Sequence, residues 1–239
     1  MIYAGTSGWS YPHWKNVFYP EALSQRNWLD YYVKFFNCVE LNVTFYRLLK
    51  KEVFENWYKK TPADFYFIAK GSRFITHIKK LKDIEQPLDL FINNASGLKH
   101  KLCVVLWQFP ASFKKDVDKL NTFFKLLKKT KLRHSFEFRN QTWFDEQVYE
   151  LCREYNFCLC IADSDRFPCE KVITADYLYL RFHARGSLYN SNYSGKQLKD
   201  WAKFAAEFKK GKDIFAFFNN DGQGFAVKNA LKFRELLDK

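Results

Sequence analysis

Acidic, basic and amide side chains recur at the ends of short apolar runs in this chain. These polar residues are Glu40, Asn42, Lys70, Gln108, Glu137, Arg139, Asp163, Arg181, His183 and Asn219. Removing a charge from water is costly unless the charge is paired, so a buried strand has little use for one along its length. Polar residues at the same end of every strand therefore predict a shared, solvent-accessible mouth where binding or chemistry takes place.

The acidic members of this group are candidates for acid–base chemistry. Glu40 and Glu137 are the type of carboxylate pair used in glycosidic or similar hydrolysis, and Asp163 is a further catalytic candidate. His183 is a candidate proton shuttle because a histidine at a strand end titrates near neutrality. Glu137, Asp163 and His183 also offer oxygen and nitrogen ligands for a hard divalent metal. No H-x-H or H-E-x-x-H spacing supports a metal, so none is predicted, and the cofactor is left open.

The basic and amide members favour an anionic ligand. Arginine grips oxyanions through a rigid two-point fork, and we expect Lys70, Arg139 and Arg181 to hold the anion. Asn42 and Asn219 would orient it. The remaining ligand-binding candidates are His77, Gln108, Arg185 and Asn220. A desolvated lysine such as Lys70 is also a Schiff-base candidate, although anion contact or ion pairing is the commoner role. The polar loops 184–195 and 220–224 precede helices and favour phosphate binding, with ordinary capping turns as the alternative.

Strand periodicity predicts which of these side chains face inward. Side chains alternate between the two faces of a strand. We therefore expect polar pairs inside and apolar neighbours outside in three strands: Glu40 and Asn42 against Val39 and Leu41, Glu137 and Arg139 against Phe136 and Phe138, and Arg181 and His183 against Leu180 and Phe182. The alternative role for this ring of charges is a structural ion-pair network that neutralises itself.

The elements that must position these residues alternate between strand and helix. Apolar runs predict strands at 2–5, 38–42, 65–70, 102–108, 134–139, 157–163, 177–183 and 214–219. Helical patterns lie between them at 27–36, 51–60, 87–99, 116–129, 144–155, 195–208 and 224–237. Eight such units predict a single-domain TIM-type (β/α)8 barrel over residues 1–239, with its site at the C-terminal strand ends. A doubly wound sheet is the alternative, but no G-x-G-x-x-G turn follows the first strand.

Composition limits the possible binding partners and the cellular compartment of the protein. The chain has 239 residues, 47% of them hydrophobic, and a formal net charge of +13. A solvated lysine-rich exterior explains this charge, and attraction to phosphate or nucleic acid is the alternative. Six cysteines without a C-x-x-C spacing indicate free thiols in a reducing cytosol. No leader and no membrane-spanning apolar run is recognised, so we expect a cytoplasmic protein without a membrane partner. The oligomeric state is left open.

Several motifs together resemble the YecE-like family, domain-of-unknown-function family 72. They are GTSGWSY at 5–11, Trp14, FYP at 18–20, VELNVTFY at 39–46, Thr61-Pro62, FIAK at 67–70, Thr76-His77, QFP at 108–110, FEFR at 136–139, Trp143, Asp163, RFH at 181–183 and FNN at 218–220. The resemblance runs nearly from end to end and implies a βα barrel, but it supplies no function. The family pattern generally has glycine after the histidine of the seventh strand, whereas this chain has Ala184. A close backbone approach to a ligand there would be impaired.

Three functional hypotheses follow. The leading one is an enzyme, of hydrolase or lyase type, that acts on an anionic or phosphorylated small molecule at the barrel mouth. The second is a nucleic-acid-processing protein, similar to barrel endonucleases at the level of fold, that uses the basic surface. The third is a non-catalytic binding module whose charge ring is structural. Aromatic residues in the first loop, among them Trp9 and Tyr11, are expected to cover the barrel rim, and stacking on a sugar or base is the alternative.

Overall fold

The strands form two parallel sheets. The structure is a computed structural model that describes residues 1–186, 191–208 and 211–238. Its strands are β1 (Ile2–Thr6), β2 (Cys38–Leu41), β3 (Tyr66–Lys70), β4 (Leu102–Phe109), β5 (Arg133–Phe138), β6 (Cys158–Leu159), β7 (Ile161–Asp163), β8 (Tyr177–Phe182) and β9 (Asp213–Phe218). One sheet has the order β1-β9-β8-β7 and the other has the order β2-β3-β4-β5-β6. Every paired strand runs parallel to its neighbour.

The two sheets meet at both of their edges and give a barrel-like α/β fold. Just beyond β1, Ser7 makes a parallel bridge to Glu40 of β2. At the other junction, β6 and β7 are consecutive in the chain and flank Cys160, whose backbone N–H donates to the Phe136 carbonyl at 2.9 Å. Sequence periodicity predicts one strand over 157–163, so the interruption at Cys160 corrects that expectation.

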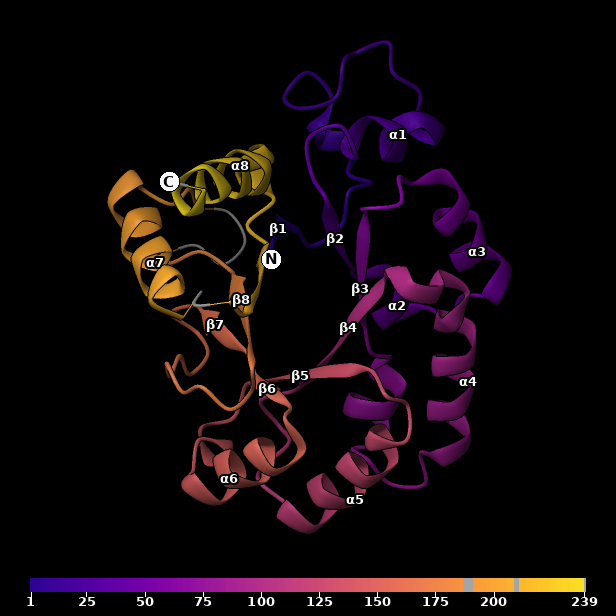
Figure 1. Ribbon diagram of the computed structural model, residues 1–239, viewed down its shortest axis with the longest axis vertical. Coiled ribbons are helices and arrows are strands. Elements are labelled where there is room, and N and C mark those ends of the chain that lie inside the picture. The colour runs from indigo at the N-terminus through magenta and orange to yellow at the C-terminus, as the bar shows by residue number, and fades with distance from the viewer. Residues whose placement is uncertain (187–190, 209–210, 239) are drawn as a thin grey trace.

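Helices lie around the outside of the strands (Figure 1). They are α1 (Trp28–Tyr32), α2 (Val43–Tyr46), α3 (Lys51–Lys60), α4 (Glu85–Ala95), α5 (Val117–Lys128), α6 (Glu146–Tyr155), α7 (Gly195–Phe208) and α8 (Phe225–Leu237). Asp116 and Asp145 cap α5 and α6 by accepting backbone hydrogen bonds from Lys119 and Gln147, as aspartate does at helix starts. The expected helix 27–36 is shorter than predicted and ends at Tyr32, and the short α2 was not predicted.

Side-chain alternation divides the core into an inner and an outer part. The inner cluster comprises buried Tyr3, Cys38, Ile68, Val104, Leu106, Cys158, Cys160, Tyr177, Tyr179, Phe215 and Phe217. The outer cluster lies between strands and helices and includes Val39, Leu41, Phe136, Phe138, Leu180 and Phe182. The inward and outward faces predicted for β2, β5 and β8 are therefore confirmed.

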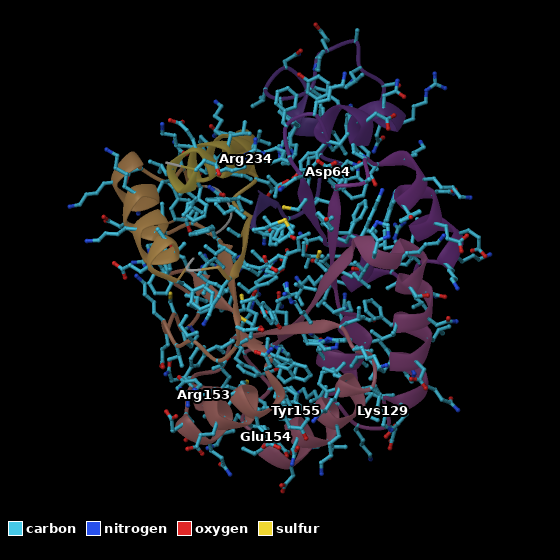
Figure 2. The ribbon with its side chains drawn as sticks, in the orientation of Figure 1. Asp64, Lys129, Arg153, Glu154, Tyr155 and Arg234 are labelled. Atoms are coloured by element: carbon cyan, nitrogen blue, oxygen red, sulfur yellow. The ribbon has the colours of Figure 1, made fainter. Side chains whose placement is uncertain are left out.

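Charged side chains of the outer helices point away from this core. Figure 2 shows Lys129, Arg153 and Glu154 projecting outward from the ends of α5 and α6. All three are exposed. Of the loops proposed for phosphate, residues 187–190 lie outside the described residues. In the part of the chain that is described, no helix is long and apolar enough to cross a membrane.

Candidate functional site

A fully buried ion-pair cluster lies at the carboxyl end of the strands, with Arg181 of β8 at its centre. Arg181 donates from Nε to Glu40 Oε2 at 3.0 Å and from Nη2 to Glu40 Oε1 at 2.7 Å. Glu40 Oε1 also accepts from Ser7 Oγ at 2.7 Å, and Oε2 accepts from the Tyr179 hydroxyl at 2.7 Å. Both oxygens of Glu40 therefore accept two hydrogen bonds each from the protein.

Glu137 of β5 occupies the other side of Arg181. Its Oε2 accepts from Arg181 Nη1, and its Oε1 accepts from Arg139 Nε at 2.7 Å. His183 lies beside it, with Nε2 at 3.5 Å from Glu137 Oε2. On the other edge of the imidazole ring, Asn219 Nδ2 lies 3.3 Å from His183 Nδ1. Two carboxylates and two guanidinium groups thus balance one another in charge; Arg139 is 14% exposed, and the other three side chains are fully buried.

Electrostatics fixes the protonation states in this cluster. Burial alone would raise the pKa of Glu40 and of Glu137, but the charge of Arg181 outweighs it, helped by Lys70 at Glu40 and by Arg139 at Glu137. The net effect is a lowered pKa for Glu40 and a pKa well below the usual range for Glu137. Burial, partly offset by Glu137, lowers the pKa of His183 to about 4. These carboxylates stay ionised and this imidazole stays neutral at pH 7.

An open cleft of about 600 Å³ lies above the cluster. It is lined by Tyr11, Asn42, Phe45, Tyr46, Lys70, Arg73, His77, Gln108, Arg139, Asn219 and Asp221. Its basic side chains are Lys70, Arg73 and Arg139, and its acidic one is Asp221. Burial raises the pKa of Asp221. The lining therefore carries more basic than acidic side chains.

Lys70, at the end of β3, has an unusual environment for a lysine. It is only 6% exposed, and its Nζ lies 4.1 Å from the centre of the Phe45 ring. Among the described residues, no carboxylate forms an ion pair with it, since Glu40 and Glu137 are engaged by Arg181. Burial, followed by the positive charge of Arg181, lowers the pKa of Lys70 to about 7. A large fraction of this amine is therefore neutral at physiological pH.

His77 reaches the cleft from one turn of π-helix, Phe74–Ile78. Gln108 Nε2 lies 3.4 Å from His77 Nε2, and His77 Nδ1 lies 2.8 Å from Thr76 Oγ1. Burial, then the charges of Lys70 and Arg139, lowers the pKa of His77 to about 4. The imidazole is neutral, and donation from Gln108 to Nε2 places its proton on Nδ1.

Two buried amide oxygens in the cleft wall have no protein partner within the described residues. They are Asn42 Oδ1 and Gln108 Oε1. The nitrogen of Asn42 is used, since it donates to the Ser7 carbonyl at 3.0 Å. Buried acceptors are normally satisfied, so each oxygen would accept a hydrogen bond from a ligand or from ordered water once its side chain turns toward the cleft.

Asp163 does not join the ring in which the sequence analysis placed it. It lies on the outward face of β7, where Oδ1 accepts from Arg185 Nε at 2.8 Å and Oδ2 accepts from Trp201 Nε1 at 3.2 Å. Arg185, expected to contact ligand, is thereby paired with Asp163. Glu137, Asp163 and His183 are not brought together as metal ligands. Within residues 1–186, 191–208 and 211–238, no group of three or more metal-binding side chains is positioned to hold an ion.

Asn220 also serves a different purpose from the one expected. It is fully buried, and its Nδ2 donates to the Ser191 carbonyl at 2.9 Å and to Asn229 Oδ1 at 2.8 Å. These bonds connect the loop after β9 to the loop after β8 and to α8. Asn219, one residue earlier, does line the cleft.

The cleft contains residues that sequence reasoning did not include among the site candidates. They are Tyr11, Phe45, Tyr46, Arg73 and Asp221. Arg73 and Asp221 lie in loops directly after strands, which is the signal that would have selected them. The aromatic first loop partly covers the rim, as expected, because Trp14 and Tyr19 are buried. Trp9 and Tyr11 instead line an adjoining apolar cavity of about 440 Å³, which shares Tyr11, Asn42 and Tyr46 with the cleft.

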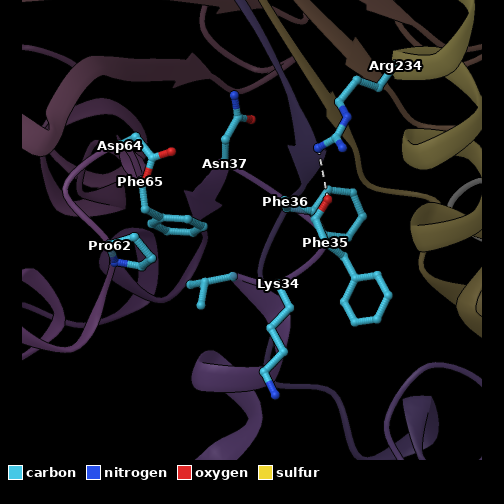
Figure 3. A pocket seen from close by; sticks show the side chains of 9 residues that line it. Lys34, Phe35, Phe36, Asn37, Pro62, Asp64, Phe65 and Arg234 are labelled. Carbon is cyan, nitrogen blue, oxygen red and sulfur yellow. Dashed lines mark hydrogen bonds between the residues drawn. The ribbon is translucent and has the colours of Figure 1, made fainter.

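A smaller cavity of about 160 Å³ lies at the opposite end, before β2 and β3. Figure 3 shows Phe35, Phe36, Phe65 and Pro62 around it, with Arg234 donating to the Phe35 carbonyl at 2.9 Å. Its lining is mixed, because Lys34, Asn37 and Asp64 also contribute to it. The arginine there is engaged by backbone, and the cavity is much smaller than the cleft.

Comparison with known proteins agrees with this architecture. Residues 3–239 match the family described as "Protein of unknown function DUF72". The chain belongs to the DUF72 family. Among DUF72 relatives, UPF0759 protein YunF of Bacillus subtilis is 29% identical over 273 aligned positions, covering 100% of this chain and 95% of YunF. UPF0759 protein YecE of Escherichia coli K12 is 34% identical over 113 residues, which is 47% of this chain and 39% of YecE. The family resemblance drawn from the motifs is confirmed.

Solved DUF72 structures share the fold closely. The DUF72 family protein TM1631 of Thermotoga maritima superposes with a TM-score of 0.90 at 33% identity, with full coverage of both chains. A DUF72 protein from Enterococcus faecalis gives a TM-score of 0.86 at 21% identity, covering 100% of this chain and 96% of that one. D-psicose 3-epimerase, solved in the presence of D-fructose, gives 0.51 at 8% identity, covering 91% of each chain. The last two likenesses concern fold alone.

Proposed function

We propose that this chain is an enzyme that binds a phosphorylated small molecule in the cleft and acts on it by acid–base chemistry. The proposal takes residues 1–239 as one (β/α)8 barrel domain with its site at the C-terminal strand ends, the position that ligands occupy in that architecture. The observation that carries it is the convergence of Lys70, Arg73 and Arg139 on one cleft of about 600 Å³.

The charge balance favours an anion rather than a neutral ligand. Glu40 and Glu137 are compensated by Arg181 and by Arg139, which also lines the cleft. Arg73, and Lys70 when it is protonated, are then the positive charges left for a ligand, and Asp221 is the carboxylate on the same lining. Guanidinium groups suit the geometry of phosphate oxygens.

The buried amide oxygens suggest the rest of the ligand. Asn42 Oδ1 and Gln108 Oε1 accept no described hydrogen bond, and a hydroxyl group is the commonest donor on a small metabolite. A phosphate ester that carries hydroxyl groups, such as a sugar phosphate, would satisfy the cations, and also the amide oxygens once the Asn42 and Gln108 side chains turn toward it.

The roles of the carboxylates change from those expected from sequence. Glu40 and Glu137 are buried beneath the cleft and their oxygens are occupied by Arg181, Arg139, Ser7 and Tyr179. We therefore assign them to positioning Arg181 and setting the charge around Lys70. Proton transfer at the ligand falls to Lys70, whose amine lines the cleft and has a pKa of about 7, close to the working pH.

A binding screen tests the proposal. Calorimetry and thermal shift should detect sugar phosphates but not the same sugars without phosphate. Arg73→Ala, which removes an exposed cation from the rim, should weaken binding by about tenfold or more, as expected for loss of a charged hydrogen bond. Lys129→Ala on the outer surface is the matched control and should leave affinity unchanged. Absence of any shift across the panel would overturn the proposal. Binding of oligonucleotides alone, with a steep salt dependence, would favour the nucleic-acid alternative.

A further inference from the structure

Lys70 differs from the other cations of the cleft in its contacts. Arg139 is fixed by Glu137, and Arg73 is exposed at the rim. Lys70 has no ion pair with any described carboxylate and lies against the face of Phe45 at 4.1 Å. An aromatic face attracts an ammonium ion, but much less strongly than a carboxylate does in a desolvated site. The nitrogen is therefore directed at the ligand space without a fixed polar partner.

The surrounding charges do not require an ammonium at this position. Glu40 and Glu137 carry two negative charges, and Arg181 and Arg139 carry two positive charges. The cluster is neutral before Lys70 is counted. A protonated Lys70 would add an unbalanced charge at a site that is 6% exposed, so the free amine is accessible near pH 7. A neutral amine is a nucleophile, whereas an ammonium is not.

From this placement we infer that Lys70 forms a Schiff base with an aldehyde or ketone whose phosphate group is held by Arg73 and Arg139. The inference rests on the proposed function and narrows its substrate to phosphorylated carbonyl compounds. The Nζ lone pair forms a bond to the carbonyl carbon while the carbon–oxygen π bond breaks. Both amine hydrogens pass to the former carbonyl oxygen in the course of the reaction. That oxygen leaves as water, and a carbon–nitrogen double bond remains. No further oxidant, reductant or cofactor is needed.

The neighbouring groups suit this step. His77 and Gln108 line the same cleft, and Nε2 of the neutral His77 is able to accept a proton from the intermediate alcohol once Gln108 moves away from it. The unpaired oxygens of Gln108 and Asn42 would orient hydroxyl groups next to the carbonyl after a rotation of the two amide side chains toward the cleft. Once formed, the protonated imine is a cation and an electron sink, the property that lyases of this chemical type use.

Reductive trapping tests the inference. The full chain is incubated with dihydroxyacetone phosphate and cyanoborohydride, which reduces the imine to a stable secondary amine, and the modified peptide is located by mass spectrometry. We expect stoichiometric labelling at Lys70, none with unphosphorylated dihydroxyacetone, and competition by inorganic phosphate. The labelling rate at Lys70 should level off above about pH 7, whereas exposed lysines continue to gain reactivity up to higher pH.

Two variants make the outcomes distinct. Lys70→Arg keeps a cation but cannot form the imine and should abolish the adduct, whereas Lys129→Arg should not change it. If Lys70→Arg does not fold, two measurements on the wild-type protein decide whether the imine forms at Lys70. They are the competition by inorganic phosphate and the pH dependence of labelling of the peptide that contains Lys70. Binding of the phosphorylated ketone without an adduct at Lys70 would overturn the Schiff base while leaving the proposed function intact. Neither binding nor labelling would overturn both, and equal labelling of surface lysines would count against the inference.

Discussion

Arg181 and Glu40 are joined by two hydrogen bonds, of 3.0 and 2.7 Å, although both side chains are completely buried. The pair connects the two sheets, because Arg181 lies on β8 and Glu40 lies on β2. Removing one member leaves the other charge desolvated and unpaired, which costs far more than the pair itself contributes.

We predict that Arg181→Met lowers the free energy of unfolding by about 3–5 kcal/mol, because it leaves buried Glu40 without its counter-ion and removes one of the two arginines paired with Glu137. Adding Glu40→Gln should recover part of this loss, so the double variant is less destabilised than the sum of the single variants. Urea denaturation measures each value. Lys232→Ala breaks an exposed pair with Glu235 and should change stability by no more than about 1 kcal/mol. A loss below 1 kcal/mol for Arg181→Met would contradict the structural role of the cluster.

The lowered pKa of Lys70 predicts a specific pH dependence of stability. Between about pH 7 and the ordinary value of 10.5, the unfolded chain holds a proton at Lys70 that the folded chain has lost. Stability contributed by this group is therefore complete above pH 10.5 and disappears as the pH falls to about 7.

Comparison with Lys70→Met isolates that effect. The difference in unfolding free energy between wild type and variant should shift in favour of the wild type as the pH rises from 7 to 10. Buried thiols such as Cys38 and Cys158 titrate in both proteins, so their contribution cancels in the difference. Lys129→Met is the control and should run parallel to the wild type. A pH-independent difference for Lys70→Met would show that Lys70 has an ordinary pKa.

The sequence predicted the barrel-like fold and much of the site because polarity marked the alternation in several strands. In β2, β5 and β8, charged and apolar residues alternate, and the inward face could be read directly. The segment from Cys158 to Asp163 has no such contrast, since cysteine, leucine and isoleucine are all apolar. Its inward face is set by Cys158 and Cys160, which directs Asp163 outward to Trp201.

Contacts between segments that lie far apart in the chain could not be predicted from the sequence. Nothing local indicates that Ser7 and Tyr179 both donate to Glu40, and these bonds decide that the carboxylate is structural. The π-helical turn that places His77 over the cleft likewise depends on tertiary packing. Residue types therefore identified the members of the site, while their partners determined their roles.

Gly71, directly after Lys70, should not tolerate a side chain. A Cβ at this position would lie 2.2 Å from Cε3 of the buried Trp107 ring, and a packed indole cannot move aside cheaply. We expect Gly71→Ala to destabilise the protein by about 1–3 kcal/mol through overpacking and to weaken ligand binding by displacing Lys70. Gly195→Ala, where the Cβ meets nothing within 4 Å, should be neutral within about 0.5 kcal/mol. Thermal and urea unfolding of both variants provide the comparison, and equal effects would contradict it.

Ala184 occupies a backbone conformation that suits glycine. Its φ is 70°, it is buried, and its N–H donates to the Tyr193 hydroxyl at 3.1 Å. Relief of this left-handed strain outweighs the added flexibility of the unfolded chain, so Ala184→Gly should raise stability by about 0.5 kcal/mol. Ala205→Gly within α7 has no strain to relieve and should lower stability by about 1 kcal/mol or more. Denaturation midpoints measured side by side check the opposite signs.

The charge cluster also limits how a guest molecule can lie. Arg181 and its two carboxylates are completely buried and do not line the cleft, so a ligand cannot enter the interior past them. A compound too long for the cleft has to extend sideways past Tyr46, toward the indoles of Trp9 and Trp57. In the proposed site, discrimination by size is then set by the aromatic residues at the rim, and changes in those few side chains would alter the range of accepted molecules without altering the buried charge cluster.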